Sequence, residues 1–190
     1  MADSKKVLEI IRAIGLKMEA EKEYLTELDQ PIGDSDHGIN MARGFAAVEG
    51  KLPDLEGKDI GTILKTVGMT LVSTVGGASG PLYGSAYMKA GMALAGKEEM
   101  DMDDFLSMMD TAVQAVEQRG KATVEEATML DAMVPSLKAM KDAAAEGKAV
   151  RVRQHHIQQR QINLIFPQTV PGFLSCSTEK GIISFIRQIH

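Results

Sequence analysis

Apolar side chains recur every three or four positions along most of the chain, the spacing that places them on one face of an α-helix. Such stripes cover six segments, which are residues 7–18, 40–49, 60–75, 83–96, 101–120 and 128–147. Convincing alternation of apolar and polar residues, which would indicate half-buried strands, is absent from residues 1–147. The pattern therefore predicts an all-α fold of antiparallel helices joined by short loops.

Several polar residues and one proline mark the expected helix ends. Asp3 or Ser4 can cap the first helix and Asp59 the third, because short polar side chains accept hydrogen bonds from the free N–H groups of a first turn. Pro135 lies inside the last stripe and is expected to kink that helix or to move its start.

The composition changes near Gly147. Residues 1–147 carry 15 Lys or Arg and 25 Asp or Glu, whereas residues 148–190 carry six and one, and all 13 methionines precede the change. We therefore predict a helical domain over residues 1–147 and an atypical C-terminal tail over residues 148–190. We interpret the tail as the product of a frameshifted or otherwise altered reading frame that begins near Lys148.

Charge and cysteine content narrow the class of protein. The net charge of −5 disfavours nucleic acid as a partner. The single cysteine, Cys176, excludes an intrachain disulfide and agrees with a reducing compartment. No apolar run is long enough to span a bilayer, and residues 1–6 lack the apolar core of a signal peptide. We expect a cytoplasmic protein that binds neither nucleic acid nor membrane.

An acidic loop carries the strongest chemical signal. Asp29, Asp34 and Asp36 lie within eight residues, and Pro31 and Gly33 let the loop fold back so that the three carboxylates converge. Magnesium at phosphate sites prefers a few carboxylate ligands and leaves its other positions to phosphate and water. The loop therefore indicates a magnesium site, although aspartates that only solvate a turn and cap a helix are equally consistent with these residues.

The residues that follow this loop favour an anion. His37 to Asn40 are expected to form the first turn of the next helix, where free N–H groups and the helix dipole attract phosphate. An EF-hand does not fit, because Phe45 stands at the twelfth position counted from Asp34, where calcium loops need glutamate.

A second loop, over residues 74–85, is rich in glycine. Gly76, Gly77 and Gly80 let main-chain N–H groups approach an anion, and Ser79 can add a hydroxyl. It is not a Walker A loop, because no lysine follows, and it is not a dinucleotide fingerprint, because a helix precedes it. Taken alone, a plain turn between two packed helices explains it equally well.

Three segments in this order resemble one known family. They are Leu28-Asp29 with Ile32-Gly33-Asp34-Ser35-Asp36-His37-Gly38-Ile39-Asn40-Met41-Ala42-Arg43-Gly44, then Gly68-Met69-Thr70-Leu71 through Tyr83-Gly84, then Arg119-Gly120-Lys121-Ala122. The family is the nucleotide-binding (L) subunit of the phosphotransferase-dependent dihydroxyacetone kinases, and the likeness covers residues 7–147. It implies an eight-helix antiparallel barrel with the nucleotide at one end.

The resemblance also implies roles for particular residues. Two Mg²⁺ ions would be held by Asp29, Asp34 and Asp36. An ADP or ATP cofactor would contact two sets of residues. Its phosphates would lie near His37, Gly38, Ile39, Asn40, Ala78 and Ser79. Its adenine would lie near Gly120 and Met129. No residue of this chain is needed as nucleophile or general base, because phosphoryl transfer depends mainly on alignment and charge neutralisation.

The implied partners are two other subunits. One carries a phosphohistidine of a phosphotransferase system, which would phosphorylate bound ADP, and the other holds dihydroxyacetone, which would receive the γ-phosphoryl group. The sequence leaves open whether the chain also forms a homodimer.

Departures from the family keep a second interpretation open. Ala127 stands where the family has a lysine. After Gly147 the chain lacks the Gly-Arg-Ala-Ser-Tyr-Leu-Gly segment and the Asp-Pro-Gly turn that close over the nucleotide, so the last two helices of the barrel are in doubt. A catalytically inactive or regulatory relative that binds metal or protein partners without retaining nucleotide is the alternative. A magnesium-dependent hydrolase is less well supported, since only His37 could act as a base near the aspartates.

Overall fold

The computed structural model describes residues 1–146. In these residues the α-helices are α1 (Ser4–Ala20), α2 (Lys22–Asp29), α3 (His37–Glu49), α4 (Ile60–Thr74), α5 (Ser79–Ala93), α6 (Met102–Gly120) and α7 (Leu130–Ala145). The predicted domain boundary, the tail and the last two helices of the expected barrel lie outside the described residues.

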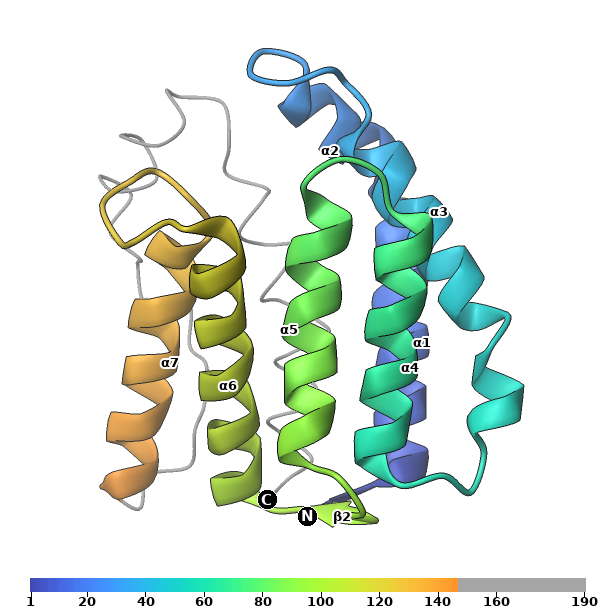
Figure 1. Ribbon diagram of the computed structural model, residues 1–190, viewed down its shortest axis with the longest axis vertical. Helices are drawn as coiled ribbons and strands as arrows, with labels where there is room; N and C mark the ends of the chain where they lie inside the picture. Colours follow the sequence, from blue (N-terminus) through green and yellow to red (C-terminus); the bar gives the residue numbers. More distant parts are fainter. Residues whose placement is uncertain (147–190) are drawn as a thin grey trace.

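Helices α2 to α7 run alternately up and down and pack side by side, and α1 precedes α2 in the same sense, which confirms the predicted all-α architecture (Figure 1). Helices α4, α5, α6 and α7 follow one another across the molecule, while α1 packs against α3 and α4 (Figure 1). The connections α2–α3, α4–α5 and α6–α7 all lie at the same end, the upper end of Figure 1. The acidic loop, the glycine loop and the segment before Leu130 therefore gather at one end of the bundle.

Local sequence signals account for most helix starts. The Asp3 side chain accepts a hydrogen bond from the N–H of Lys6 at 2.7 Å, and Asp59 accepts one from Thr62 at 3.0 Å, so both expected caps are confirmed. Pro135 lies inside α7, which begins at Leu130, two residues later than the apolar stripe suggested.

Four short elements were not predicted. Helix α2 is separated from α1 by Glu21, and a 3-10 helix covers Leu52–Leu55. Strands β1 (Ala2–Asp3) and β2 (Glu99–Met100) form an antiparallel pair that ties the N-terminus to the connection between α5 and α6. Two residues are too few for alternation to be visible in a sequence, so this departure from an all-helical reading has a simple cause.

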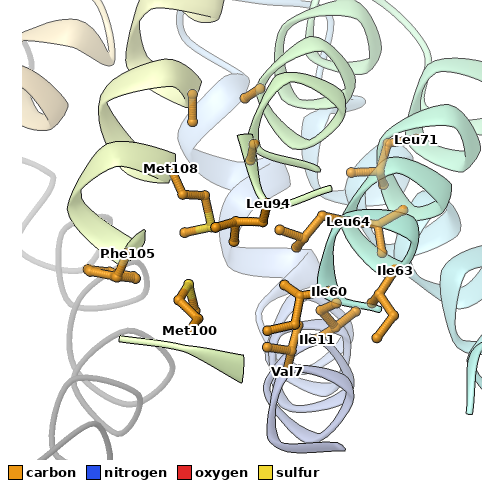
Figure 2. Packing of buried hydrophobic residues seen from close by; sticks show 14 of the residues in the cluster. Val7, Ile11, Ile60, Ile63, Leu64, Leu71, Leu94, Met100, Phe105 and Met108 are labelled. Carbon is orange, nitrogen blue, oxygen red and sulfur yellow. The ribbon is translucent and has the colours of Figure 1, made fainter. Parts of the chain in front are cut away.

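The core fills the space between α1, α4, α5 and α6. Helix α4 contributes Ile60, Ile63 and Leu71, each with no measurable exposure, and Figure 2 shows Ile60 and Ile63 near Val7 and Ile11 of α1. Burying each such side chain stabilises the fold by roughly 1.5–3 kcal/mol. This packing gives the loops at the upper end a firm base. None of the helices within residues 1–146 has the length and apolarity needed to cross a bilayer.

Helices α4 and α5 approach so closely that their main chains touch. A β-carbon at Gly68 would lie 2.7 Å from the carbonyl oxygen of Gly84, and one at Gly61 would lie 2.6 Å from that of Gly91. Neither distance leaves room for a side chain, so the two helices form a tight pair whose connection is the glycine loop.

Candidate functional site

Three aspartates converge at the upper end of the bundle. Asp29 ends α2, Asp34 lies in the following loop and Asp36 directly precedes α3, and one carboxylate oxygen from each lies within 4.8 Å of the others. Within residues 1–146 none of the three forms an ion pair with Lys or Arg. Three close, unbalanced carboxylates suit a hard divalent cation. The predicted convergence is confirmed, and metal binding stays a prediction.

Asp29 also organises the loop around it. Its Oδ2 accepts hydrogen bonds from the N–H groups of Asp36 at 3.1 Å and His37 at 3.4 Å, and its carbonyl oxygen accepts one from Gly33 at 2.7 Å. Ser35 takes a left-handed conformation with φ of 62°, which completes the turn. Folding the loop back onto the end of α2 therefore brings the carboxylates together and fixes the start of α3.

The N-termini of α3 and α5 meet beside the acidic cluster. His37 is the first residue of α3 and Ser79 the first of α5, and His37 Nδ1 lies 3.1 Å from Ser79 Oγ. The N–H groups of Gly38, Ile39 and Ser79 make no hydrogen bond to any part of residues 1–146. Two helix N-termini with free N–H groups make a surface that favours an anion such as phosphate.

The predicted phosphate contacts differ in what they can offer. The Ile39 side chain is apolar and exposed, so this residue can bind phosphate only through its main-chain N–H. Ala78 precedes α5 as its N-cap and has no side-chain cap of its own, so its role is also a main-chain one. Asn40, in contrast, is buried, with an exposed fraction of 6%, and its side chain faces the glycine loop beside Gly76.

His37 is partly buried, and this burial favours its neutral form. Burial lowers the pKa of His37 below its ordinary value, and this effect outweighs the nearby negative charges of Asp29 and Asp36, which act in the opposite direction. A neutral ring can accept a hydrogen bond from the Ser79 hydroxyl at Nδ1 and donate one from Nε2. His37 therefore joins the two helix N-termini and can still offer one donor.

Arg43 belongs to the site although it had no predicted role. Its guanidinium donates to Asn40 Oδ1 at 2.6 Å and to the carbonyl oxygen of Thr74 at 3.0 Å. The spacing of three residues between Asn40 and Arg43 on one helix face was a usable signal. The contact with Thr74 had no such signal, because that residue lies on another helix.

The predicted adenine side lies at the same end of the bundle. Gly120 ends α6, where a β-carbon would lie 3.4 Å from Leu82 in the first turn of α5, and Met129 precedes α7 and packs against the core. The connecting segment is held by Asp131, whose carboxylate accepts hydrogen bonds from the N–H groups of Glu125 and Thr128. Gly120 and Met129 therefore lie at the same end of the bundle as the aspartates (Figure 1), and their contact with adenine stays a prediction.

Comparison with known proteins finds a matching family model and several relatives. The model of the DAK2 domain family matches residues 31–161. The chain is 44% identical over 132 residues to the ADP-binding subunit of the PEP-dependent dihydroxyacetone kinase of Escherichia coli K12, with 70% of this chain and 63% of that protein aligned. It is 38% identical over 166 residues to the ADP-binding subunit of the PTS-dependent enzyme of Lactococcus lactis, which covers 80% of this chain and 84% of that protein.

A solved structure shares the fold. The dihydroxyacetone kinase of C. freundii, determined in complex with AMP-PNP and Mg²⁺, superimposes with a TM-score of 0.64 at 22% identity, over 78% of this chain and 26% of that chain. The chain spans about 63% of the length of the E. coli relative and of two relatives from Listeria innocua.

Proposed function

This chain belongs to the DAK2 domain family, and on that premise we propose that it is an ADP-binding subunit of a PEP-dependent dihydroxyacetone kinase, holding Mg²⁺ and ADP or ATP for phosphoryl transfer. The observation that carries the proposal is the set of three carboxylates within 4.8 Å beside two helix N-termini. Cation ligands and anion ligands are thus adjacent, which is the arrangement a metal–polyphosphate ligand requires.

The residues fit the implied metal by their chemistry. Asp29, Asp34 and Asp36 offer oxygen ligands only, and hard cations such as Mg²⁺ prefer oxygen. We propose that these three hold two ions. When bound, the ions supply neutralisation of phosphate charge and alignment of the transferring group.

The chain's own residues orient the phosphates. In the proposal the free N–H groups of Gly38, Ile39 and Ser79 bind phosphate oxygens, with His37, Asn40 and Ala78 at the edge of the same surface. Gly120 and Met129 would lie along the adenine. In the proposal no residue of this chain needs to act as nucleophile or base, since positioning and electrostatic stabilisation carry most of phosphoryl transfer.

The proposal extends to a relay between partners. A phosphohistidine on a phosphotransferase subunit would phosphorylate ADP held on this chain, and the γ-phosphoryl group would then pass to dihydroxyacetone held by another kinase subunit in the cytoplasm. The names of the E. coli and L. lactis relatives, which describe ADP-binding subunits of PEP- or PTS-dependent kinases, support this extension. The position of the site at an end of the bundle, rather than inside it, would leave it open to both partners.

Nucleotide and metal content test the proposal directly. The full chain is purified without added nucleotide and denatured, and the released ADP and Mg²⁺ are quantified per protein. We expect near-stoichiometric ADP with about two metal ions, the number of a two-metal phosphoryl site.

A matched variant gives the control. Asp36→Asn removes one candidate ligand and should empty the site, whereas Asp54→Asn, an exposed change in the 3-10 helix, should not. If the wild-type chain is empty and cannot be loaded with Mg·ADP, the proposal is wrong and the interpretation as a relative that does not retain nucleotide replaces it.

A further inference from the structure

We infer that Arg43 is a positioning residue that fixes which way the Asn40 amide faces, so that its NH₂ group is presented to the phosphate site. The inference rests on the proposed function in one respect, which is that Asn40 lies next to a bound phosphate. The orientation itself is a property of the chain without any ligand.

The contacts of Arg43 join two parts of the site. One guanidinium nitrogen, Nη2, donates to Asn40 Oδ1 at 2.6 Å on the same helix, α3. Nε donates to the carbonyl oxygen of Thr74 at 3.0 Å, where α4 ends and the glycine loop begins. Arg43 therefore links the helix that follows the acidic loop to the loop that precedes α5.

The chemistry of the guanidinium group decides the orientation of the amide. Arginine has five N–H donors and no acceptor, so the group of Asn40 that faces Arg43 must be the carbonyl oxygen. A rotated amide would place its NH₂ group against N–H donors and lose the bond. The hydrogen-bond partner therefore identifies which side-chain atom of Asn40 is the oxygen.

The whole amide lies against the glycine loop, since a β-carbon at Gly76 would lie 3.1 Å from both Oδ1 and Nδ2 of Asn40. Oδ1 is taken by Arg43, whereas Nδ2 makes no hydrogen bond to a residue in the range 1–146 and keeps its donors for a ligand at this loop. Two N–H donors are therefore held against Gly76 in the loop between α4 and α5, the loop that leads into the N-terminus of α5. Donors fixed in place before binding are the form in which hydrogen bonds to phosphate contribute most.

A double-mutant cycle tests whether Arg43 acts through Asn40. The dissociation constant for Mg·ADP is measured by calorimetry for the wild-type full chain, Asn40→Ala, Arg43→Met and the double variant. A hydrogen bond to a charged group is worth roughly ten- to a hundredfold in affinity. We expect about a tenfold loss for Arg43→Met in the wild-type background and none when Asn40 is already alanine.

Two controls separate positioning from a general structural effect. Arg12→Met removes an exposed arginine that pairs with Glu49 through Nε, away from the site, and should leave the affinity unchanged. Urea unfolding of each variant identifies any loss of affinity that follows from a loss of fold. Arg43→Lys keeps the charge but replaces the rigid planar fork with a compact ammonium that does not reach both acceptors in the same geometry, so it should restore part of the affinity.

A second measurement needs no nucleotide. The side-chain NH₂ resonances of Asn40 in the nucleotide-free protein should shift in Arg43→Met and stay close to wild type in Arg12→Met. If the Asn40 resonances are unaffected, or if the losses in affinity from the two single variants add, Arg43 does not set the amide and the inference is wrong. If those resonances shift but the wild-type chain does not bind Mg·ADP, the proposed function fails and with it any role for Asn40 in phosphate binding.

Discussion

Replacing Asp34 by asparagine removes one of three negative charges that lie within 4.8 Å of each other, and we expect the metal-free protein to become more stable. Two unit charges at that distance repel by about 0.9 kcal/mol in water. Salt at physiological ionic strength screens this to about half. Relief from two neighbours therefore stabilises the folded state by about 1 kcal/mol, which raises Tm by about 2–4 °C for a domain of this size.

The same change should weaken the response to magnesium. A ligand at a hundred times its Kd stabilises a protein by about 2.7 kcal/mol, and each tenfold loss of affinity removes about 1.4 kcal/mol of that gain. Asp34 makes no hydrogen bond to the protein within residues 1–146, so the variant loses no structural contact there that would obscure the effect. Removing a single charge should thus stabilise the protein without metal and reduce the stabilisation by metal.

The assay is urea unfolding followed by circular dichroism, first with EDTA and then across a magnesium titration. Asp54→Asn serves as the matched control, since it removes one exposed carboxylate outside the cluster. An Asp34→Asn protein that is less stable than wild type in EDTA would show that the carboxylates do not repel in the folded state. An unchanged magnesium response would show that Asp34 is not a ligand.

Three further predictions follow from the geometry. Gly38→Ala would place a β-carbon 1.9 Å from a main-chain carbonyl oxygen of α2 and should destabilise the fold by at least 1–3 kcal/mol. At Gly33 the clash, at 2.2 Å, is with the side-chain carboxylate of Asp29, so Gly33→Ala should weaken magnesium binding and disturb the hydrogen bonds of this carboxylate to Asp36 and His37, with a smaller loss in urea stability than Gly38→Ala. The folded-state pKa of His37 is lowered, so the unfolded chain takes up this proton first as the pH falls through the ordinary value of about 6.5. Wild type should therefore lose more stability than His37→Gln between about pH 7 and pH 5.5. Equal losses in the two proteins would contradict this. Ala127 has φ of 58°, so Ala127→Gly should raise the unfolding free energy by about 0.5–1 kcal/mol, and a lower Tm would refute strain at this position.

Features that depend on neighbours in sequence could be predicted, and features that depend on distant contacts could not. Asp59 was identified as a cap because a cap needs only the next three residues. The convergence of Asp29 with Asp34 followed from the turn-forming residues between them. The contact of Arg43 with Thr74 joins positions 31 residues apart on different helices, and no periodicity of a single helix encodes it.

The short strands show the same limit. The pairing of Ala2 with Met100 brings together two segments of two residues each, and neither is long enough to carry a pattern of its own. The role of Asn40 as a buried polar residue was likewise hidden, because burial depends on what packs over α3 rather than on the residue type.

The main-chain contact between α4 and α5 has a consequence for the entropy of ligand binding. A flexible loop that closes around an anion loses about 1–2 kcal/mol of conformational freedom for each residue it orders. The loop between these helices connects two main chains that lie too close together for a side chain between them. Its conformation is therefore already restricted when the chain folds. Anion affinity at this loop should therefore depend on Gly61, which lies in the first turn of α4, about 20 Å along the helix from the loop.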